Sequence, residues 1–154
     1  MLNGFGARVE GIRVVGSGAA LGAFHFNSAQ NTTVEKCRVD GSTRMATLNG
    51  ATYCHLKENW VQGCSLETVL VDSTSTDTRI KDNRFTDGQH YGVVLEGAFN
   101  KVVGNTIAGH MFDGVLVASK MNTISLNTCN NNANGIYVAK ENGDHNSLTG
   151  NTLS

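Results

Sequence analysis

Short apolar runs and polar residues alternate along this chain in a pattern that returns every 22 to 25 residues. In VVGNTIAGHMFDGVLV, from Val102 to Val117, apolar residues alternate with polar ones over stretches of three to five positions. A period of two is typical of β-strands, whereas an amphipathic helix has a period of 3.6. Strands this short cannot bury themselves singly, so the repeat predicts that they stack coil on coil into a solenoid.

The repeat aligns on a column of mostly asparagine residues. Its members are Ile12, Cys37, Asn59, Asn83, Asn105, Asn127 and Asn151. An apolar residue lies three positions before each member and another lies two positions after it, which predicts two strands that face one core. A second polar column, five residues earlier, consists of Cys54, Thr78, Asn100, Asn122 and Asn146. Asparagine tolerates the left-handed bend between strands, and stacked asparagine side chains hydrogen-bond to one another, so we expect asparagine ladders.

A third apolar run occurs in each period, and it usually begins with glycine. The runs are GAFH at 22–25, TVLV at 68–71, GVVL at 92–95, GVLV at 114–117 and GIYV at 135–138. We expect the glycine to serve the bend before the strand. The pattern therefore predicts an all-β, right-handed parallel β-helix of about six to seven coils, in a single domain over residues 1–154.

This repeat resembles that of the right-handed β-helices of the pectin-lyase-like superfamily. The match to G-I-x-V…N-x-I-x-x-N-x-I is close from Thr78 to Ser154 and degenerate from Ala7 to Thr76. The superfamily includes pectate lyases, mannuronan epimerases, periplasmic carbohydrate-binding β-helices and phage tailspikes, so the resemblance implies a polysaccharide ligand. No catalytic residue of these families transfers. The chain has no proline and so lacks the Asp-Pro-His-Glu motif of the epimerases, and no arginine accompanies its acidic column as in pectate lyases.

The third strand is expected to carry an apolar stripe on its outer side. With Val93 and Leu95 taken as inward, the outward column reads Leu48, Leu70, Val94, Leu116 and Tyr137. An exposed apolar stripe marks an interface or a groove, and we expect it to pack in a homotrimer or against neighbouring chain segments. The alternative is a shifted register that places the stripe in the core.

Two carboxylates follow this strand on adjacent coils. The second outward column reads Gly50, Asp72, Glu96, Ala118 and Ala139. Strands stack about 4.7–4.9 Å apart, which is close to the separation of about 5–5.5 Å between the two carboxyl groups of retaining glycosidases. Asp72 and Glu96 are therefore candidate catalytic residues, as acid and as nucleophile or base. Paired carboxylates also suit calcium, which is the one cofactor that the sequence suggests. The alternative is that Asp72 and Glu96 are two separately solvated surface acids.

Four residues are candidate sugar contacts. Trp60 lies between Arg38 and Arg84 in the outward column beside the asparagines, where cation–π stacking or a sugar platform suits an anionic polysaccharide. Tyr137, at the end of the apolar stripe, is the fourth. The alternative for this face is ordinary solvated charge.

Two neighbouring turns, TDGQHYG and AGHMFDG, carry further candidates for acid–base chemistry or a metal site. Each contains a histidine and an aspartate, and the residues concerned are Asp87, His90, His110 and Asp113. The repeat aligns His90 with Phe112, so the two histidines are expected to be offset, and the alternative is a pair of solvated loops.

The charge and composition of the chain argue against several classes of partner. The net charge of −1 argues against nucleic acid and anionic membranes as partners, and no apolar run reaches the length of about 18 residues that spans a bilayer. The N-terminal sequence MLNGFGARVEG does not read as a signal peptide. The four cysteines, Cys37, Cys54, Cys64 and Cys129, show no paired spacing, so we expect reduced, buried thiols.

Three functions remain as hypotheses. The first is a virion tailspike or appendage, assembled in the bacterial cytoplasm, that recognises bacterial surface polysaccharide and, if catalytic, cleaves it. The alternative is a secreted or periplasmic polysaccharide lyase or C-5 epimerase-like module, and the third is a structural spacer without a ligand. Both ends lack the polar caps that solenoids need, so we expect a segment of a longer chain or an assembly.

Overall fold

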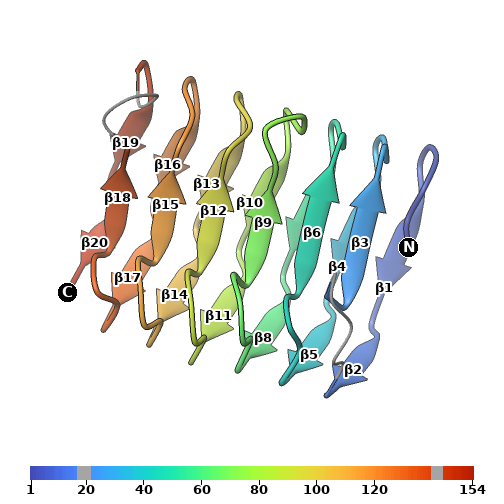
Figure 1. Cartoon of the computed structure of the whole chain (residues 1–154), viewed down its shortest axis with the longest axis horizontal. Helices are drawn as coiled ribbons and strands as arrows, with labels where there is room; N and C mark the ends of the chain where they lie inside the picture. Colours follow the sequence, from blue (N-terminus) through green and yellow to red (C-terminus); the bar gives the residue numbers. More distant parts are fainter. Residues whose placement is uncertain (17–21, 140–143) are drawn as a thin grey trace.

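The computed structural model describes residues 1–16, 22–139 and 144–154, and it shows a solenoid of stacked coils (Figure 1). The described part of the chain forms twenty β-strands and no helix. Each of the first six coils contributes one strand to each of three sheets, and the last coil contributes β19 and β20 to two of them. The predicted all-β parallel β-helix is confirmed.

All three sheets are parallel, and each is named after its first strand. Sheet 1 has seven strands: β1 (Arg8–Glu10), β4 (Thr33–Glu35), β7 (His55–Lys57), β10 (Arg79–Lys81), β13 (Lys101–Val103), β16 (Thr123–Ser125) and β19 (Ser147–Thr149). Sheet 2 has seven: β2 (Arg13–Val15), β5 (Arg38–Asp40), β8 (Trp60–Gln62), β11 (Arg84–Thr86), β14 (Thr106–Ala108), β17 (Thr128–Asn130) and β20 (Thr152–Leu153). Sheet 3 has six: β3 (Phe24–Asn27), β6 (Ala46–Asn49), β9 (Val69–Val71), β12 (Val93–Leu95), β15 (Val115–Val117) and β18 (Ile136–Val138).

The core is a column of apolar side chains inside the coils. In sheets 1 and 2 the middle residue of each strand points inward, as Ile80 and Phe85 do in one coil, and both are fully buried. In sheet 3 the two outer residues of the strand point inward, as Val93 and Leu95 do. The two predicted apolar columns are therefore confirmed, since strands three residues long expose every second side chain.

The predicted asparagine ladders are also confirmed. The backbone N–H and side-chain Nδ2 of Asn83 donate to Oδ1 of Asn105 at 2.9 and 3.0 Å. Asn105 in turn donates from Nδ2 to the carbonyl of Ile80 and to Oδ1 of Asn127. The second column is joined in the same way, and the backbone N–H of Asn100 donates to Oδ1 of Asn122. Each rung thus satisfies backbone groups at a corner where the sheet ladder is interrupted.

Three of the glycines before sheet 3 have a different purpose from the one expected. Gly92, Gly114 and Gly135 are absent from the residues with positive φ. A Cβ on Gly92 would lie 2.4 Å from the carbonyl oxygen of Gly114 and 2.5 Å from Cγ2 of Ile107. The expected bend is confirmed at Gly22, whose φ is 98°, but is wrong at these three positions, which need glycine to let successive coils approach one another.

The register of sheet 3 corrects the expected outer columns at their first members. Leu48 pairs with Val71 and is buried, so the outward residue of β6 is Thr47, which pairs with Leu70. In the second outer column the residue of β6 that aligns with Asp72 is Asn49, not Gly50, because Asn49 directly follows Leu48, which pairs with Val71. The expected step from Leu48 to Leu70 was 22 residues, whereas the step between these two coils in sheet 3 is 23 residues, from Thr47 to Leu70.

Candidate functional site

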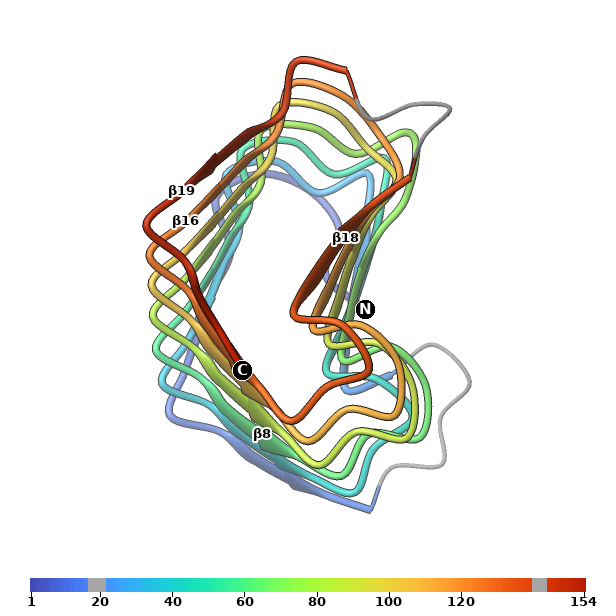
Figure 2. The ribbon, with the colours of Figure 1, turned by 90° about the vertical axis from the view of Figure 1, so that its left-hand side faces the viewer.

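The outer face of sheet 3 is largely apolar along the coil axis. Its outward residues, called here the outer column, are His25, Thr47, Leu70, Val94, Leu116 and Tyr137. Val94 lies outside the core cluster yet is only 4% exposed, whereas Tyr137 is 49% exposed. Viewed along the axis, the turns that precede sheet 3 project beyond its outer face (Figure 2). The column therefore forms an apolar floor that ends in one accessible aromatic ring.

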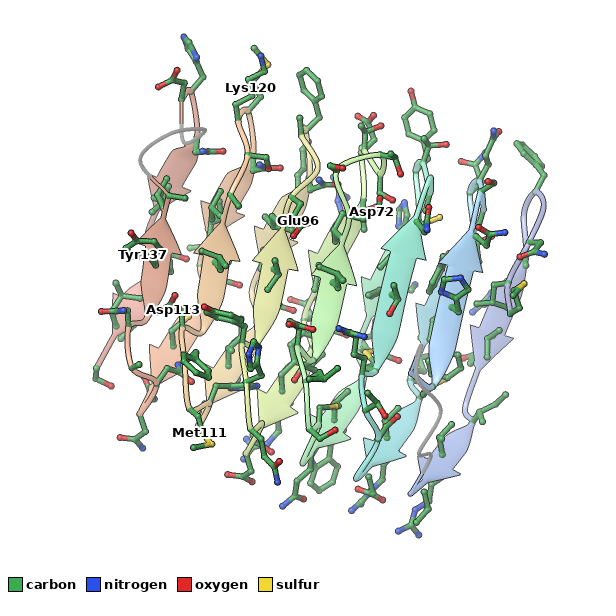
Figure 3. All side chains as sticks on the ribbon, viewed as in Figure 1. Asp72, Glu96, Met111, Asp113, Lys120 and Tyr137 are labelled. Atoms are coloured by element: carbon green, nitrogen blue, oxygen red, sulfur yellow. The ribbon has the colours of Figure 1, made fainter. Side chains whose placement is uncertain are left out.

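A cleft of about 620 Å³ opens where the strands of sheet 3 end. Its described lining is Ser73, Glu96, Ala98, Ala118, Ser119, Lys120 and Asp144. These residues come from four successive coils, so the cleft extends along the solenoid axis over roughly 14 Å at the usual strand spacing. Glu96 and Lys120 both lie at this end of the sheet (Figure 3). An elongated opening with charged walls next to an apolar floor suits a linear ligand more than a compact one.

The candidate catalytic pair lies on adjacent coils, as the repeat predicted, but the two carboxylates differ in environment. Oδ1 of Asp72 accepts three hydrogen bonds within its own turn, from the backbone and hydroxyl of Thr74 and from the hydroxyl of Ser75. The carboxylate of Glu96 is exposed in the cleft and bonds no side chain or backbone group of the described residues. Glu96 is thus available to a ligand, while Asp72 holds its turn.

The turns before sheet 3 carry a polar cluster that the sequence did not reveal. Arg44 and Glu67 form an ion pair, with Nη2 and Oε2 2.6 Å apart. Nδ1 of His90 lies 3.1 Å from Oε1 of Glu67 without the alignment of a hydrogen bond. Arg44 and Glu67 each lie two residues before a paired strand position, Ala46 and Val69. The correct register would have brought them together.

The two histidines are offset, as the alignment predicted. The ring of His90 lies 4.7 Å from the ring of Phe112. His110 is buried, with Nε2 3.2 Å from the hydroxyl of Thr68 and Nδ1 3.2 Å from Oδ1 of Asn132. Burial lowers the pKa of His110, so the neutral ring serves to fill the turn. His110 is therefore neither solvated nor open to a ligand.

The remaining predicted sugar contacts lie on a different face. Arg38, Trp60 and Arg84 share one outward column of sheet 2, and the Arg38 guanidinium lies 4.3 Å from the centre of the Trp60 ring. Nε of Arg38 also donates to Asp40 at 2.9 Å, so this cation already has a partner. Since Tyr137 is on sheet 3, the four predicted contacts do not form one site.

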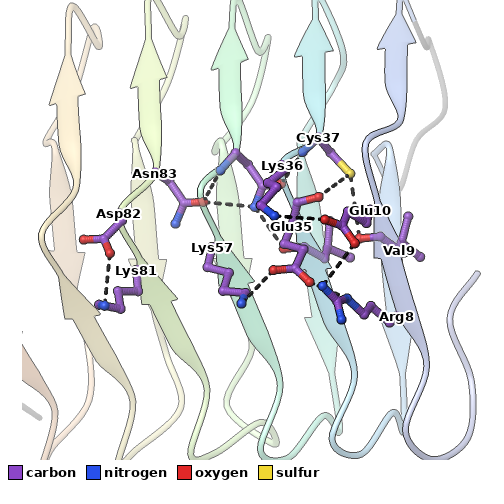
Figure 4. A network of polar contacts seen from close by, with 12 residues as sticks. Arg8, Val9, Glu10, Glu35, Lys36, Cys37, Lys57, Lys81, Asp82 and Asn83 are labelled. Atoms are coloured by element: carbon purple, nitrogen blue, oxygen red, sulfur yellow. Dashed lines mark hydrogen bonds and ion pairs between the residues drawn. The ribbon is translucent and has the colours of Figure 1, made fainter.

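The outer face of sheet 1 carries an ion network near the N-terminus (Figure 4). Glu35 is 1% exposed and pairs with Arg8 and with Lys57, whose Nζ lies 2.7 Å from Oε2. The Lys57 ammonium, helped by Arg8, holds the pKa of Glu35 below its usual value. Lys36 pairs with Glu10 at 3.0 Å. These charges neutralise one another, which marks the network as structural.

No group of three or more His, Cys, Asp or Glu residues is placed to hold a metal ion within residues 1–16, 22–139 and 144–154. The four cysteines are free and buried, as expected. Burial raises the pKa of the Cys64 and Cys129 thiols to about 11. Over the same described ranges, no helix is long and apolar enough to cross a membrane.

Comparison with known proteins identifies the fold and the family. The structure is similar to the A-module of the mannuronan C-5 epimerase AlgE4 of Azotobacter vinelandii, with a TM-score of 0.54 and 14% sequence identity. The match covers 98% of this chain and 53% of that one, so the chain spans about half of the epimerase module's length. The search of curated proteins found no match. A family model described as "Periplasmic copper-binding protein (NosD)" matches residues 1–154, and the chain therefore belongs to the NosD family of right-handed β-helices.

Proposed function

We propose that this chain is a periplasmic or extracellular β-helix that binds linear polysaccharide in the cleft along sheet 3. The observation that carries the proposal is the extension of the cleft over four successive coils, with Glu96 and Lys120 in its walls. The accessible ring of Tyr137 on the same sheet offers a stacking face for a sugar. Membership of a family described as periplasmic supports this location over a virion appendage.

Copper does not fit the described residues, although the family description names it. Copper prefers cysteine, methionine and histidine ligands in one cluster, and a cysteine ligand must be deprotonated. The cysteines are buried, with the pKa of Cys54, Cys64 and Cys129 raised by burial, and in the described chain no group of three or more His, Cys, Asp or Glu side chains is placed to hold a metal ion. Copper therefore has no part in the proposal.

The charge of the cleft favours a neutral polysaccharide. Two carboxylates, Glu96 and Asp144, face a single ammonium, Lys120, so the described lining is net negative. Mannuronan is a polymer of uronic acids and would be repelled by this lining. The substrate of the similar epimerase is therefore not carried over to this cleft.

Binding is tested by calorimetric titration of neutral and acidic linear oligosaccharides against the wild-type chain and Lys120→Ala. We expect a neutral oligosaccharide to bind, and Lys120→Ala to weaken it about tenfold, because the ammonium donates charge-assisted hydrogen bonds to hydroxyl oxygens. Thr128→Ala, on the outer face of sheet 2, is the matched control and should bind like the wild type. Equal affinity in Lys120→Ala and the control would place the ligand elsewhere.

Catalysis at the same cleft is a second candidate function, favoured by the carboxylate of Glu96, which bonds none of the described residues and lies on the coil next to Asp72. If the pair cleaves the bound polysaccharide, Glu96→Gln should abolish reducing-end release while binding persists. Asp72→Asn should also lower the rate and, because Asp72 holds its turn, reduce stability by about 1–2 kcal/mol. Unchanged release in the double variant would exclude this pair, and calcium at these carboxylates is tested by adding the ion to the same assay.

A further inference from the structure

We propose that a second cleft, on the outer face of sheet 1, binds the carboxylate of an acidic saccharide. This cleft has a volume of about 300 Å³ and is lined by Tyr53, His55, Asp77, Thr78, Arg79, Phe99 and Lys101. It differs from the cleft of sheet 3 in its strands, lining and charge. The inference therefore goes beyond the proposed function and does not depend on it.

Unpaired cations are the first argument. His55, Arg79 and Lys101 hold the same register position on adjacent strands β7, β10 and β13. Like charges in this position repel one another, and a fold without a use for them gains nothing from stacking them. Neither Arg79 nor Lys101 forms an ion pair with any described residue, whereas Lys57, Lys36 and Lys81 on the same sheet or its corner each have a carboxylate partner.

The pKa of His55 reflects the positive charges around this column. Its ring is half-buried, and its pKa is lowered first by burial and then by the positive charges of Arg79 and Lys57. Asp77 is the one carboxylate in the lining, and it faces two permanent cations, Arg79 and Lys101. The described lining is thus net positive, and it becomes more so when His55 is protonated.

Two exposed aromatic rings are the second argument. Tyr53 and Phe99 are 57% and 50% exposed, and they occupy a corner with φ of 55° and 62°. The left-handed region disfavours bulky residues, and the equivalent corners of other coils hold Asn31 and Asp77 but also Met121 and His145. Because the rings are exposed, core packing does not explain them. The left-handed backbone itself recurs at this corner in successive coils, so the exposure of the two rings carries this argument.

Together these groups match an acidic sugar. A carboxylate accepts bidentate hydrogen bonds from a guanidinium, and a neighbouring ammonium strengthens the attraction. Tyr53 and Phe99 lie two coils apart, roughly 9–10 Å, so they offer stacking faces on both sides of a carboxylate held by Arg79 and Lys101. Single-stranded nucleic acid also uses aromatic and basic groups, but the net charge of −1 is unlike that of a nucleic-acid-binding domain.

The test is calorimetric titration of the full chain with oligogalacturonate and with the neutral oligogalactan of equal length. We expect oligogalacturonate to bind more tightly than oligogalactan, and the Arg79→Ala/Lys101→Ala double variant to lose at least tenfold in affinity. Both side chains are exposed, so the variant should retain the wild-type melting temperature. Lys81→Ala, a nearby cation paired with Asp82, is the matched control and should bind normally.

Three results would overturn the inference. Equal losses in the double variant and in Lys81→Ala would show nonspecific attraction to positive charge. Equal binding of oligogalactan would remove the role of the carboxylate, and tighter binding of a single-stranded oligonucleotide would assign the cleft to nucleic acid. Lys120→Ala distinguishes the two proposals. It should weaken binding of the neutral oligosaccharide at the cleft of sheet 3 and leave oligogalacturonate binding at the second cleft unchanged.

Discussion

At the scale of single residues, charged side chains with ion-pair partners stabilise the fold, whereas charged side chains without such partners among the described residues are candidates for ligand binding. Glu35 is buried between Arg8 and Lys57 and contributes to the fold. Glu96 and Lys120 face an open cleft without such partners among the described residues. A similar contrast distinguishes the two acidic residues of the candidate catalytic pair, because three hydrogen bonds within its turn hold Asp72.

The Glu35 network predicts a defined loss of stability in acid. Because the folded-state pKa of Glu35 lies below the unfolded value of about 4.3, the carboxylate stabilises the fold above that pH. This contribution is lost as the pH falls through the folded-state pKa. Urea unfolding from pH 7 to pH 3 should therefore show a smaller acid-induced decrease in Glu35→Gln than in the wild type. Identical decreases in both proteins would contradict the assigned role.

At the scale of elements, each coil is three short strands joined by corners, and the asparagine ladders stabilise those corners. Asn105 connects three coils, because it accepts from Asn83 and donates to the carbonyl of Ile80 and to Asn127. The strands are too short to be stable alone. Coil stacking therefore depends on these corners as much as on the apolar core.

Asn105→Ala should lower the free energy of unfolding by about 3 kcal/mol, because it leaves buried groups of Asn83 and Ile80 without partners. Thr106→Ala, the next residue in the same coil, lacks such bonds and should cost less than about 1 kcal/mol. Chemical denaturation followed by circular dichroism measures both variants. A loss in Asn105→Ala no larger than in the control would mean that the ladder contributes little.

At the scale of the whole molecule, the repeat predicted most of the fold and only part of the candidate site. The apolar and asparagine columns were predictable because local period and corner chemistry recur in every coil. The register of Thr47 and the cluster of Arg44 with Glu67 were not, because turn lengths vary by one residue and decide which side chains meet. The homotrimer expected from the apolar stripe stays a prediction.

The most direct test of the central claim compares the outer face of sheet 3, which carries the exposed ring of Tyr137, with that of sheet 2, which carries the exposed ring of Trp60. Calorimetric titration with the neutral oligosaccharide that binds best should be done on the wild type, Tyr137→Ala and Trp60→Ala. A polysaccharide that extends from the cleft onto the outer face of sheet 3 should stack on Tyr137, so Tyr137→Ala should lose about tenfold in affinity, while Trp60→Ala binds like the wild type. The opposite result, with the loss confined to Trp60→Ala, would place the polysaccharide on sheet 2 and contradict the account.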